Sequence, residues 1–179
     1  FFANINHQIL IDILKSYIPD RDIIWLLENI IRSFSTKEGT GLPLGNLTSQ
    51  LFVNIYMNKF DQFMKHKLKA QYYIRYSDDF VILSQNKVEL ENILLKIKDF
   101  LSETLKLELH PNKVSIKTIS SGVDFLGWVH FPDHRVLRTA TKKRMLRNPK
   151  LKKNNQATIN SYLGLLKHGN AEKLKRKYF

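Results

Sequence analysis

The chain has 179 residues and an apolar fraction of 43%, which fits one globular domain, or a large core with a small appendage, and excludes a disordered protein. It contains no cysteine, so disulfides and thiolate metal sites are excluded, as suits a cytoplasmic protein. No apolar run reaches the length of a membrane span, and we find no signal peptide, so we expect no membrane partner. Because the chain begins at Phe1, inside an apolar segment, we expect it to be part of a longer protein.

The formal net charge of +13 is concentrated at one end of the chain. Residues 1–134 hold 15 basic and 15 acidic side chains, whereas residues 135–179 hold 14 basic and 1 acidic. A neutral body with a strongly cationic end predicts a polyanionic partner, and nucleic acid fits best. A solvated helical face is the alternative for any single cluster of these cations. A membrane surface is disfavoured because "TKKRMLRNPKLKKNN" has no wide apolar face.

The predicted elements alternate between helices and short strands. Helical periodicity recurs in residues 7–17, 21–34, 47–68 and 88–105. Alternating or β-prone runs predict short strands in residues 71–84, which turn at 77–79, and in residues 107–120 and 123–131. Asp20 is the expected N-cap of the second helix, and the glycines and proline of residues 35–46 predict a loop. "PDHR" predicts a turn before the basic tail.

The tail itself predicts two or three helices, with a loop around Pro149 and with Gly169–Asn170 closing the helix "ATINSYLGLLKH". This order of elements predicts the α+β class, with an antiparallel sheet and packed helices. The sequence shows no internal repeat.

The stretch "YIRYSDDFVIL" places Asp78 and Asp79 side by side between two strand-like runs. A charged side chain that leaves water must be paired or must bind a metal. A tight turn would place both carboxylates at the rim of the sheet, where Mg²⁺ is bound by one or two carboxylates together with substrate phosphates. A solvated turn is the alternative for this pair taken alone.

Five stretches follow the order and spacing of the palm motifs of reverse transcriptases: "FFANINHQIL", "GLPLGNLTSQLFVNIYMN", "YIRYSDDFVIL", "LKLELHPNKVSI" and "GVDFLGW". The chain therefore resembles this family over essentially its whole length, and most closely the bacterial group II intron-like branch. The resemblance implies a right-hand polymerase palm in residues 1–131, without fingers, and a partial, basic helical thumb in residues 132–179. It also implies RNA-directed DNA synthesis with two Mg²⁺ ions, or Mn²⁺ in their place, and with template RNA, DNA primer or RNA–DNA duplex, and dNTP as partners.

In "YSDD" the resemblance makes Asp78 a direct metal ligand and Asp79 a weaker or second ligand, with Tyr76 packing the turn. The family's first metal-binding aspartate would fall four residues before Phe1, so we expect the chain by itself to be inactive. Phe2 matches the bulky residue under the incoming sugar that selects deoxynucleotides, with plain core packing as the alternative.

The loop "GLPLGNLTSQ" carries two further nucleotide-binding candidates, Gly45 and Gln50. Gly45 would let the backbone approach the nascent base pair, which any Cβ would obstruct. Thr48 and Ser49 are expected to cap the long helix, and a capping loop without further function is the alternative. Family members usually have Gln in place of Leu44 and Pro in place of Gln50. The variant seen here resembles diversity-generating retroelement enzymes, which copy a template RNA unfaithfully at adenines.

Lys113 matches a lysine that protonates the leaving pyrophosphate, with a solvated surface lysine as the alternative. Arg75 could contact a phosphate or brace the hairpin. The primer grip of the family, or plain core for its aromatic residues, corresponds to Phe125, Leu126, Gly127 and Trp128. The thumb cations expected to contact phosphates are Arg138, Lys142, Lys143, Arg144, Arg147, Lys152 and Lys153.

Three alternatives to the retroelement enzyme are considered. The first is a non-catalytic, maturase-type RNA-binding protein that keeps the fold and the basic tail. The second is a reverse transcriptase of a group II intron or a retron. The third is another nucleotidyltransferase with a similar palm, which is disfavoured because "FLGW" follows the segment of Lys113. A basic accessory protein is expected from the resemblance to retroelement enzymes alone.

Overall fold

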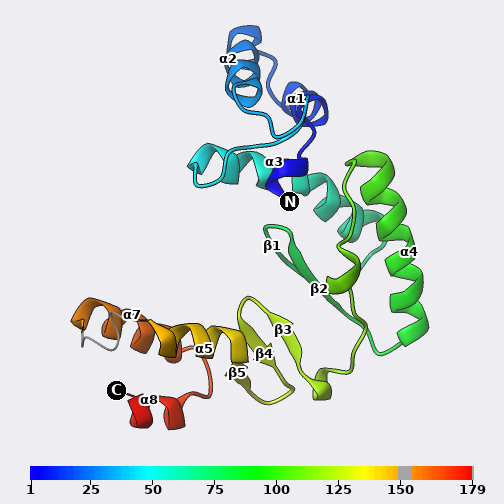
Figure 1. Ribbon diagram of the computed structural model, residues 1–179. Coiled ribbons are helices and arrows are strands. Elements are labelled where there is room, and N and C mark those ends of the chain that lie inside the picture. The colour runs from blue at the N-terminus through cyan, green and yellow to red at the C-terminus, as the bar shows by residue number, and fades with distance from the viewer. Residues whose placement is uncertain (149–154, 179) are drawn as a thin grey trace. The chain divides into compact units, whose positions relative to one another are not determined.

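The computed structural model describes residues 1–148 and 155–178 (Figure 1). The chain forms two compact units, Phe1–Ile116 and Lys117–Phe179. The boundary between these units differs from the domain boundary predicted at residue 131, because residues 123–130 fold together with the basic end of the chain. The predicted loop around Pro149 lies outside the described residues.

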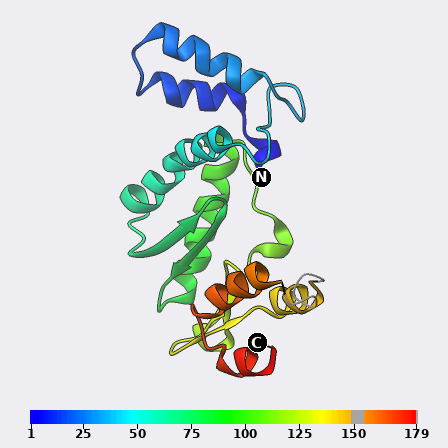
Figure 2. The same ribbon diagram turned by 90° about the vertical axis from the view of Figure 1, so that its left-hand side faces the viewer.

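Two short helices open the first unit, as predicted from their periodicity. Helices α1 (His7–Lys15) and α2 (Arg21–Arg32) lie side by side and antiparallel, as Figures 1 and 2 show. Asp20 is confirmed as the N-cap of α2, since its carboxylate accepts hydrogen bonds from the N–H groups of Asp22 and Ile23 at 2.9 and 3.0 Å. Both helices turn an apolar face to the core that they share with the next helix.

The centre of the first unit is the helix α3 (Leu47–Gln62), which widens into a π-helical stretch, Phe63–Lys67, where the sequence predicted one continuous helix. The antiparallel hairpin of β1 (Tyr72–Tyr76) and β2 (Asp79–Leu83) follows, and then α4 (Lys87–Thr104). Aromatic rings join these elements. Phe60 of α3 contacts Tyr73 and Phe80 of the hairpin, at ring-centroid distances of 6.0 and 5.0 Å, and Phe100 of α4 at 6.2 Å. These contacts hold one face of the hairpin on the core.

The predicted strand in residues 107–120 is wrong. Residues 107–110 form neither helix nor strand, and 3₁₀ turns occupy Pro111–Lys113 and Ile119–Ser121. Pro111 has no N–H to donate to a sheet, and it stands at the first position of a turn that suits its fixed φ. The His110 side chain accepts a hydrogen bond from the Asn112 N–H at 3.3 Å, which further favours the turn.

The second unit combines a three-stranded antiparallel sheet with helices. Its strands are β3 (Val123–Phe125), β4 (Trp128–His130) and β5 (Arg135–Leu137), and its helices are α5 (Thr139–Arg147), α7 (Gln156–Leu166) and α8 (Glu172–Tyr178). The sequence predicted the first two strands and the turn after them, but it missed β5. That strand has three residues and pairs only with β4, so it gives little periodic signal.

The core of the second unit is built around the ring of Trp128, which is 7% exposed and packs with Leu137, Met145 and Leu166. Gly169 lies so close to this ring that a Cβ added there would be 2.0 Å from the Trp128 Cζ3 atom.

The elements of the two units together confirm the predicted mixture of helices with small antiparallel sheets. No helix in the described part of the chain is both long enough and apolar enough to cross a membrane.

Candidate metal and nucleic-acid site

The hairpin β1–β2 turns through a loop of two residues, Ser77 and Asp78, between the paired residues Tyr76 and Asp79. Ser77 has a φ of +55°, as the first loop residue of a tight hairpin turn requires, although it is not a glycine. Asp78 and Asp79 are both exposed. Within the described residues neither carboxylate forms an ion pair with a lysine or arginine. The turn thus presents two adjacent negative charges that no cation of the described chain neutralises.

Two oxygen-donor carboxylates of this kind match the donor set that Mg²⁺ takes from a protein when phosphates and water supply the rest. In residues 1–148 and 155–178 no group of three or more His, Asp or Glu side chains lies together as a metal site. The turn therefore fits a hard divalent ion whose coordination is completed by phosphates and water, rather than a closed site made by the described residues alone.

The outer face of the hairpin is open. Tyr72, Ile74 and Tyr76 are 58%, 62% and 65% exposed, so the expectation that Tyr76 packs the turn is wrong. The cause is strand alternation: Tyr76 pairs with Asp79 and shares its face, whereas Tyr73 and Arg75 point to the core side. An aromatic ring beside the carboxylates is thus free to contact a ligand.

The inner face carries a charged network that sequence reasoning missed. Arg75 donates from Nε and Nη2 to the two carboxylate oxygens of Asp61, at 2.8 and 2.6 Å, in a bidentate pair. The Tyr73 hydroxyl donates to the same carboxylate at 2.7 Å. The remaining nitrogen of Arg75, Nη1, donates to the main-chain carbonyl of Ser77 at 2.7 Å. Of the two roles considered for Arg75, the structure shows that it braces the hairpin.

This geometry shifts the pKa values of two groups in the network. Burial acts to raise the pKa of Asp61, but the hydrogen bonds from Arg75 and Tyr73 outweigh it and hold that pKa below its ordinary value. Burial, together with the hydrogen bond to Asp61, raises the pKa of Tyr73 far above its ordinary value. The network therefore carries a carboxylate, a guanidinium and a neutral phenol at neutral pH.

The loop before α3 places Gly45 at a φ of +91°, where a side chain would be strained, while the space around its Cα is open. Leu44 is 80% exposed, and Gln50 is also exposed. The predicted capping by Thr48 and Ser49 is wrong, because α3 begins at Leu47 with Asn46 as N-cap, and no side chain makes a capping hydrogen bond. Both hydroxyl residues thus lie inside the first turn.

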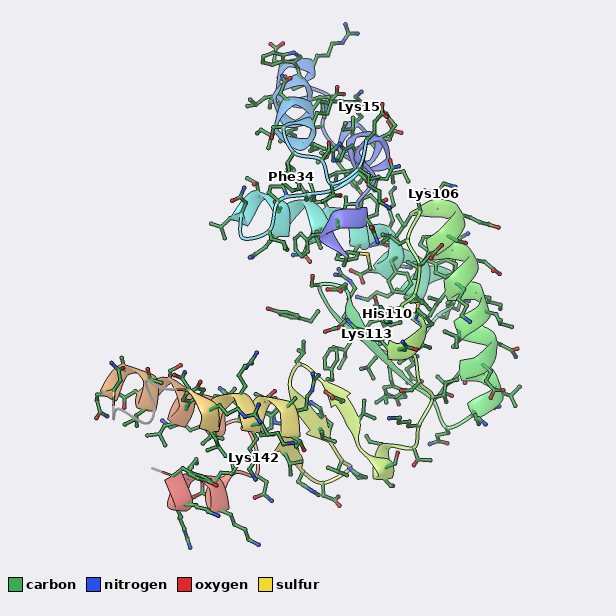
Figure 3. The ribbon with its side chains drawn as sticks, viewed as in Figure 1. Lys15, Phe34, Lys106, His110, Lys113 and Lys142 are labelled. Carbon is green, nitrogen blue, oxygen red and sulfur yellow. The ribbon has the colours of Figure 1, made fainter. Side chains whose placement is uncertain are left out.

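Two other candidates of the first unit differ in exposure. Phe2 is half-buried in a short 3₁₀ turn, edge-on to Phe1 at a ring-centroid distance of 6.0 Å, and both pack on the core. Lys113 is exposed on the turn Pro111–Lys113, next to His110 (Figure 3). Lys113 is therefore free to reach a ligand, while Phe2 has a packing role in addition to any role toward a nucleotide.

The hairpin β3–β4 carries the four primer-grip candidates. Its two loop residues, Leu126 and Gly127, both have positive φ, of +51° and +82°, as a type I′ turn requires. Leu126 is 45% exposed at the tip, Phe125 is half-buried, and Trp128 forms the core of its unit. For Trp128 the structure therefore supports the packing alternative, and of the four candidates only Leu126, at the tip of the hairpin, is exposed.

The cations of α5 differ among themselves. Lys143, Arg144 and Arg147 are exposed and line one hollow of about 750 Å³ together with Ala140, Asn148 and Tyr162. None of the three pairs with a carboxylate of the described chain. Arg138, in contrast, donates from Nε to Asp124 at 2.8 Å. Lys142 is half-buried on α5 (Figure 3). Lys152 and Lys153 lie outside the described residues.

The sequence did not reveal three residues that contact or neighbour the candidate residues: Asp61, Tyr73 and Tyr162. Asp61 meets Tyr73 and Arg75 of β1 only because α3 packs against the hairpin, and Tyr162 lines the α5 hollow from α7. Partners on different elements leave no periodic signal, although a charged residue inside a strand such as Arg75 already indicates a buried partner.

The sequence was compared with protein families and with known proteins, and the matches agree with one another. Residues 1–130 match the family described as reverse transcriptase (RNA-dependent DNA polymerase). Protein YkfC of Escherichia coli K12 is 25% identical over an alignment 180 residues long. The alignment covers 79% of this chain and 46% of that protein. The group II intron-encoded protein LtrA of Lactococcus lactis subsp. cremoris is 25% identical over an alignment 233 residues long. The alignment covers 92% of this chain and 37% of that protein.

The chain thus spans less than half the length of these relatives. Both the family match and the intron-encoded relative confirm the resemblance to group II intron-like reverse transcriptases that the motifs indicated. The chain belongs to the reverse transcriptase (RNA-dependent DNA polymerase) family.

Proposed function

We propose that the complete gene product synthesises DNA on an RNA template by phosphoryl transfer assisted by two Mg²⁺ ions. The observation that carries this proposal is the exposed turn with Asp78 and Asp79, inside a chain that matches the family over residues 1–130. Two divalent ions about 4 Å apart would stabilise the attacking and the leaving oxygen. Asp78 and Asp79 would hold such ions, and a further ligand would come from outside this chain.

The remaining candidates would position the substrates. Phe2 would lie under the incoming sugar, and Gly45 would let the backbone approach the nascent base pair. Lys113, exposed on its turn, would donate a proton to the leaving pyrophosphate. The exposed tip at Leu126 would touch the primer end. The exposed cations of α5 would contact phosphates of the template–primer duplex, which position it without reading its sequence.

The test is primer extension by the complete gene product on an RNA template with a DNA primer. Asp78→Asn removes one metal-binding charge and should reduce synthesis to background while duplex binding stays near that of the parent. Asp99→Asn, on the exposed face of α4, removes the same charge elsewhere and serves as the matched control. Substantial synthesis by Asp78→Asn would show that the metal assignment is wrong.

A maturase-type RNA-binding protein is the second candidate. The exposed cations of α5 favour it, since they would serve RNA binding equally well without any chemistry. The same assay separates the two functions, because a binding protein would retain affinity for structured RNA and make no DNA at any Mg²⁺ concentration.

Among reverse transcriptases we propose the diversity-generating retroelement type, working with a basic accessory protein. The support is Leu44, an apolar side chain that is 80% exposed where most family members carry Gln, together with Gln50 in place of Pro. Leu cannot offer the amide hydrogen bonds of Gln to a template or base pair. Sequencing the DNA product should show more errors opposite template adenine than opposite other bases, and an even, low error spectrum would remove this assignment.

A further inference from the structure

A single guanidinium group, on the core side of the hairpin, holds the turn that carries the two aspartates. Arg75 uses three of its nitrogens: Nε and Nη2 bind the carboxylate of Asp61 on α3, and Nη1 binds the carbonyl oxygen of Ser77. The side chains of Arg75 and Asp61 are 10% and 24% exposed, so the pair is largely shielded from water. The result is a continuous hydrogen-bonded connection from the helix, through one side chain, to the main chain of the turn.

The carbonyl that Arg75 holds belongs to the strained residue of the turn. Ser77 adopts a φ of +55°, which costs free energy for a residue with a Cβ and persists only where the surroundings enforce it. The carbonyl of Ser77 is part of the peptide group that links it to Asp78. Fixing this carbonyl therefore fixes the plane from which the Asp78 side chain starts, and the exposed carboxylate itself has no other support from the described chain.

We propose that Asp61 and Arg75 are positioning residues that set the direction of the Asp78 carboxylate through the Ser77 carbonyl. The proposal rests on the proposed function, since it assigns the pair to metal binding at the same turn. Their contact is with the main chain of the turn, so they act through Asp78 and touch no substrate. The alternative is that the pair only fastens the hairpin to α3 and leaves the aspartates unaffected.

The experiment compares two variants of the complete gene product that disturb the network differently. Arg75→Lys keeps the charge but replaces three nitrogens held in one plane by a single nitrogen, which cannot reproduce the bidentate pair with Asp61 together with the hydrogen bond to the Ser77 carbonyl. Tyr73→Phe removes a hydrogen bond to the same carboxylate and leaves the contact between Arg75 and Ser77 in place. It is therefore the matched control for loss of packing or stability.

For Arg75→Lys we expect the Mg²⁺ concentration that gives half-maximal DNA synthesis to rise by about tenfold, the effect of one lost hydrogen bond to a charged group. The KM for the primer–template duplex should stay the same. Tyr73→Phe should lower the unfolding temperature with an unchanged Mg²⁺ midpoint. If the Mg²⁺ midpoint of Arg75→Lys equals that of the parent, or if Tyr73→Phe shifts it equally, the proposal is overturned.

A second measurement tests the rigidity of the turn directly and does not depend on DNA synthesis. In the isotope-labelled 179-residue chain, the order parameter of the Asp78 amide should fall from about 0.85 to below about 0.6 in Arg75→Lys, while the amides of Tyr73 and Ile74 stay rigid. Asp61→Asn should act in the same direction, and it provides a second variant should Arg75→Lys fail to fold. An Asp78 amide that stays rigid in a folded variant overturns the proposal, whatever the primer-extension result says of the function.

Discussion

Removal of the three exposed cations of α5 should change how duplex binding depends on salt. Lys143, Arg144 and Arg147 line one hollow and have no carboxylate partner in the described chain, so each is free to displace a counterion from a phosphate. Replacing all three by Gln should reduce the slope of log K against log salt by about 2 to 3, at about 0.7 to 0.9 per contact. Over a fourfold rise in salt, the variant should lose roughly 20- to 40-fold less affinity than the parent.

The assay is fluorescence anisotropy of a labelled RNA–DNA hybrid, titrated at several salt concentrations between about 50 and 200 mM. The control replaces three exposed lysines of α4 by Gln, which lowers the net charge of +13 by the same amount but in the first unit; these are Lys87, Lys96 and Lys98. The control should keep the slope of the parent. Equal slopes for the two triple variants would refute the reasoning, because net charge and not the α5 surface would then explain the binding.

A single-residue comparison sharpens this test. Arg138→Gln should change the slope less than Arg144→Gln, since Arg138 already donates to Asp124 and must give up that partner to reach a phosphate. If Arg138→Gln has the larger effect, the ion pair seen here does not persist when the duplex binds.

Further predictions concern stability and fidelity. Gly169→Ala should destabilise the second unit by about 1–3 kcal/mol, because the new Cβ would fall 2.0 Å from the ring of Trp128. Gly164→Ala, which has open space around it in α7, should stabilise the unit by up to about 1 kcal/mol. Denaturant titrations followed by tryptophan fluorescence measure both unfolding free energies, and equal effects would contradict the packing of Gly169 on Trp128. The folded-state pKa of Asp61 is lowered, so its stabilising contribution is complete above its unfolded pKa of about 3.9 and is lost as the pH falls through the lower folded value. Asp61→Asn should therefore flatten the acid dependence of the unfolding free energy, and an unchanged dependence would show that the carboxylate is not stabilised by its pairing. Leu44→Gln should lower errors opposite template adenine more than errors opposite the other bases, by roughly severalfold if one hydrogen bond is gained at the base pair; sequencing products of the variant and the parent on one template decides it.

The sequence predicted well the features that depend on local physics. The apolar spacing of α1 and α2 and the cap at Asp20 need only a few neighbouring residues, and both are confirmed. The turn at Ser77 and Asp78 was visible as polar residues between two β-prone runs. Such signals lie within one element, where the periods of helix and strand are fixed by backbone geometry.

Other features depend on contacts between distant parts of the chain, and the sequence predicted these poorly. The partner of Arg75 lies fourteen residues away on a helix, and the sequence alone left open whether this arginine meets a phosphate or the protein. Trp128 could be primer grip or core until Gly169 was seen against its ring. In both cases the residue type allowed two roles, and only the tertiary contact selected one.

The hairpin shows how stability and the proposed function can share the twelve residues 72–83. With a period of two, Tyr73 and Arg75 face the core, where every buried polar side-chain atom of the described residues has a hydrogen-bond partner. The outer face has the opposite character, since it combines exposed aromatic rings with the carboxylate of Asp79 and gains little from folding alone. A strained φ at Ser77 and two unneutralised charges add to this cost at the turn. Unfavourable features gathered on one face, opposite a fully satisfied inner face, agree with the proposal that this face binds cations and a substrate.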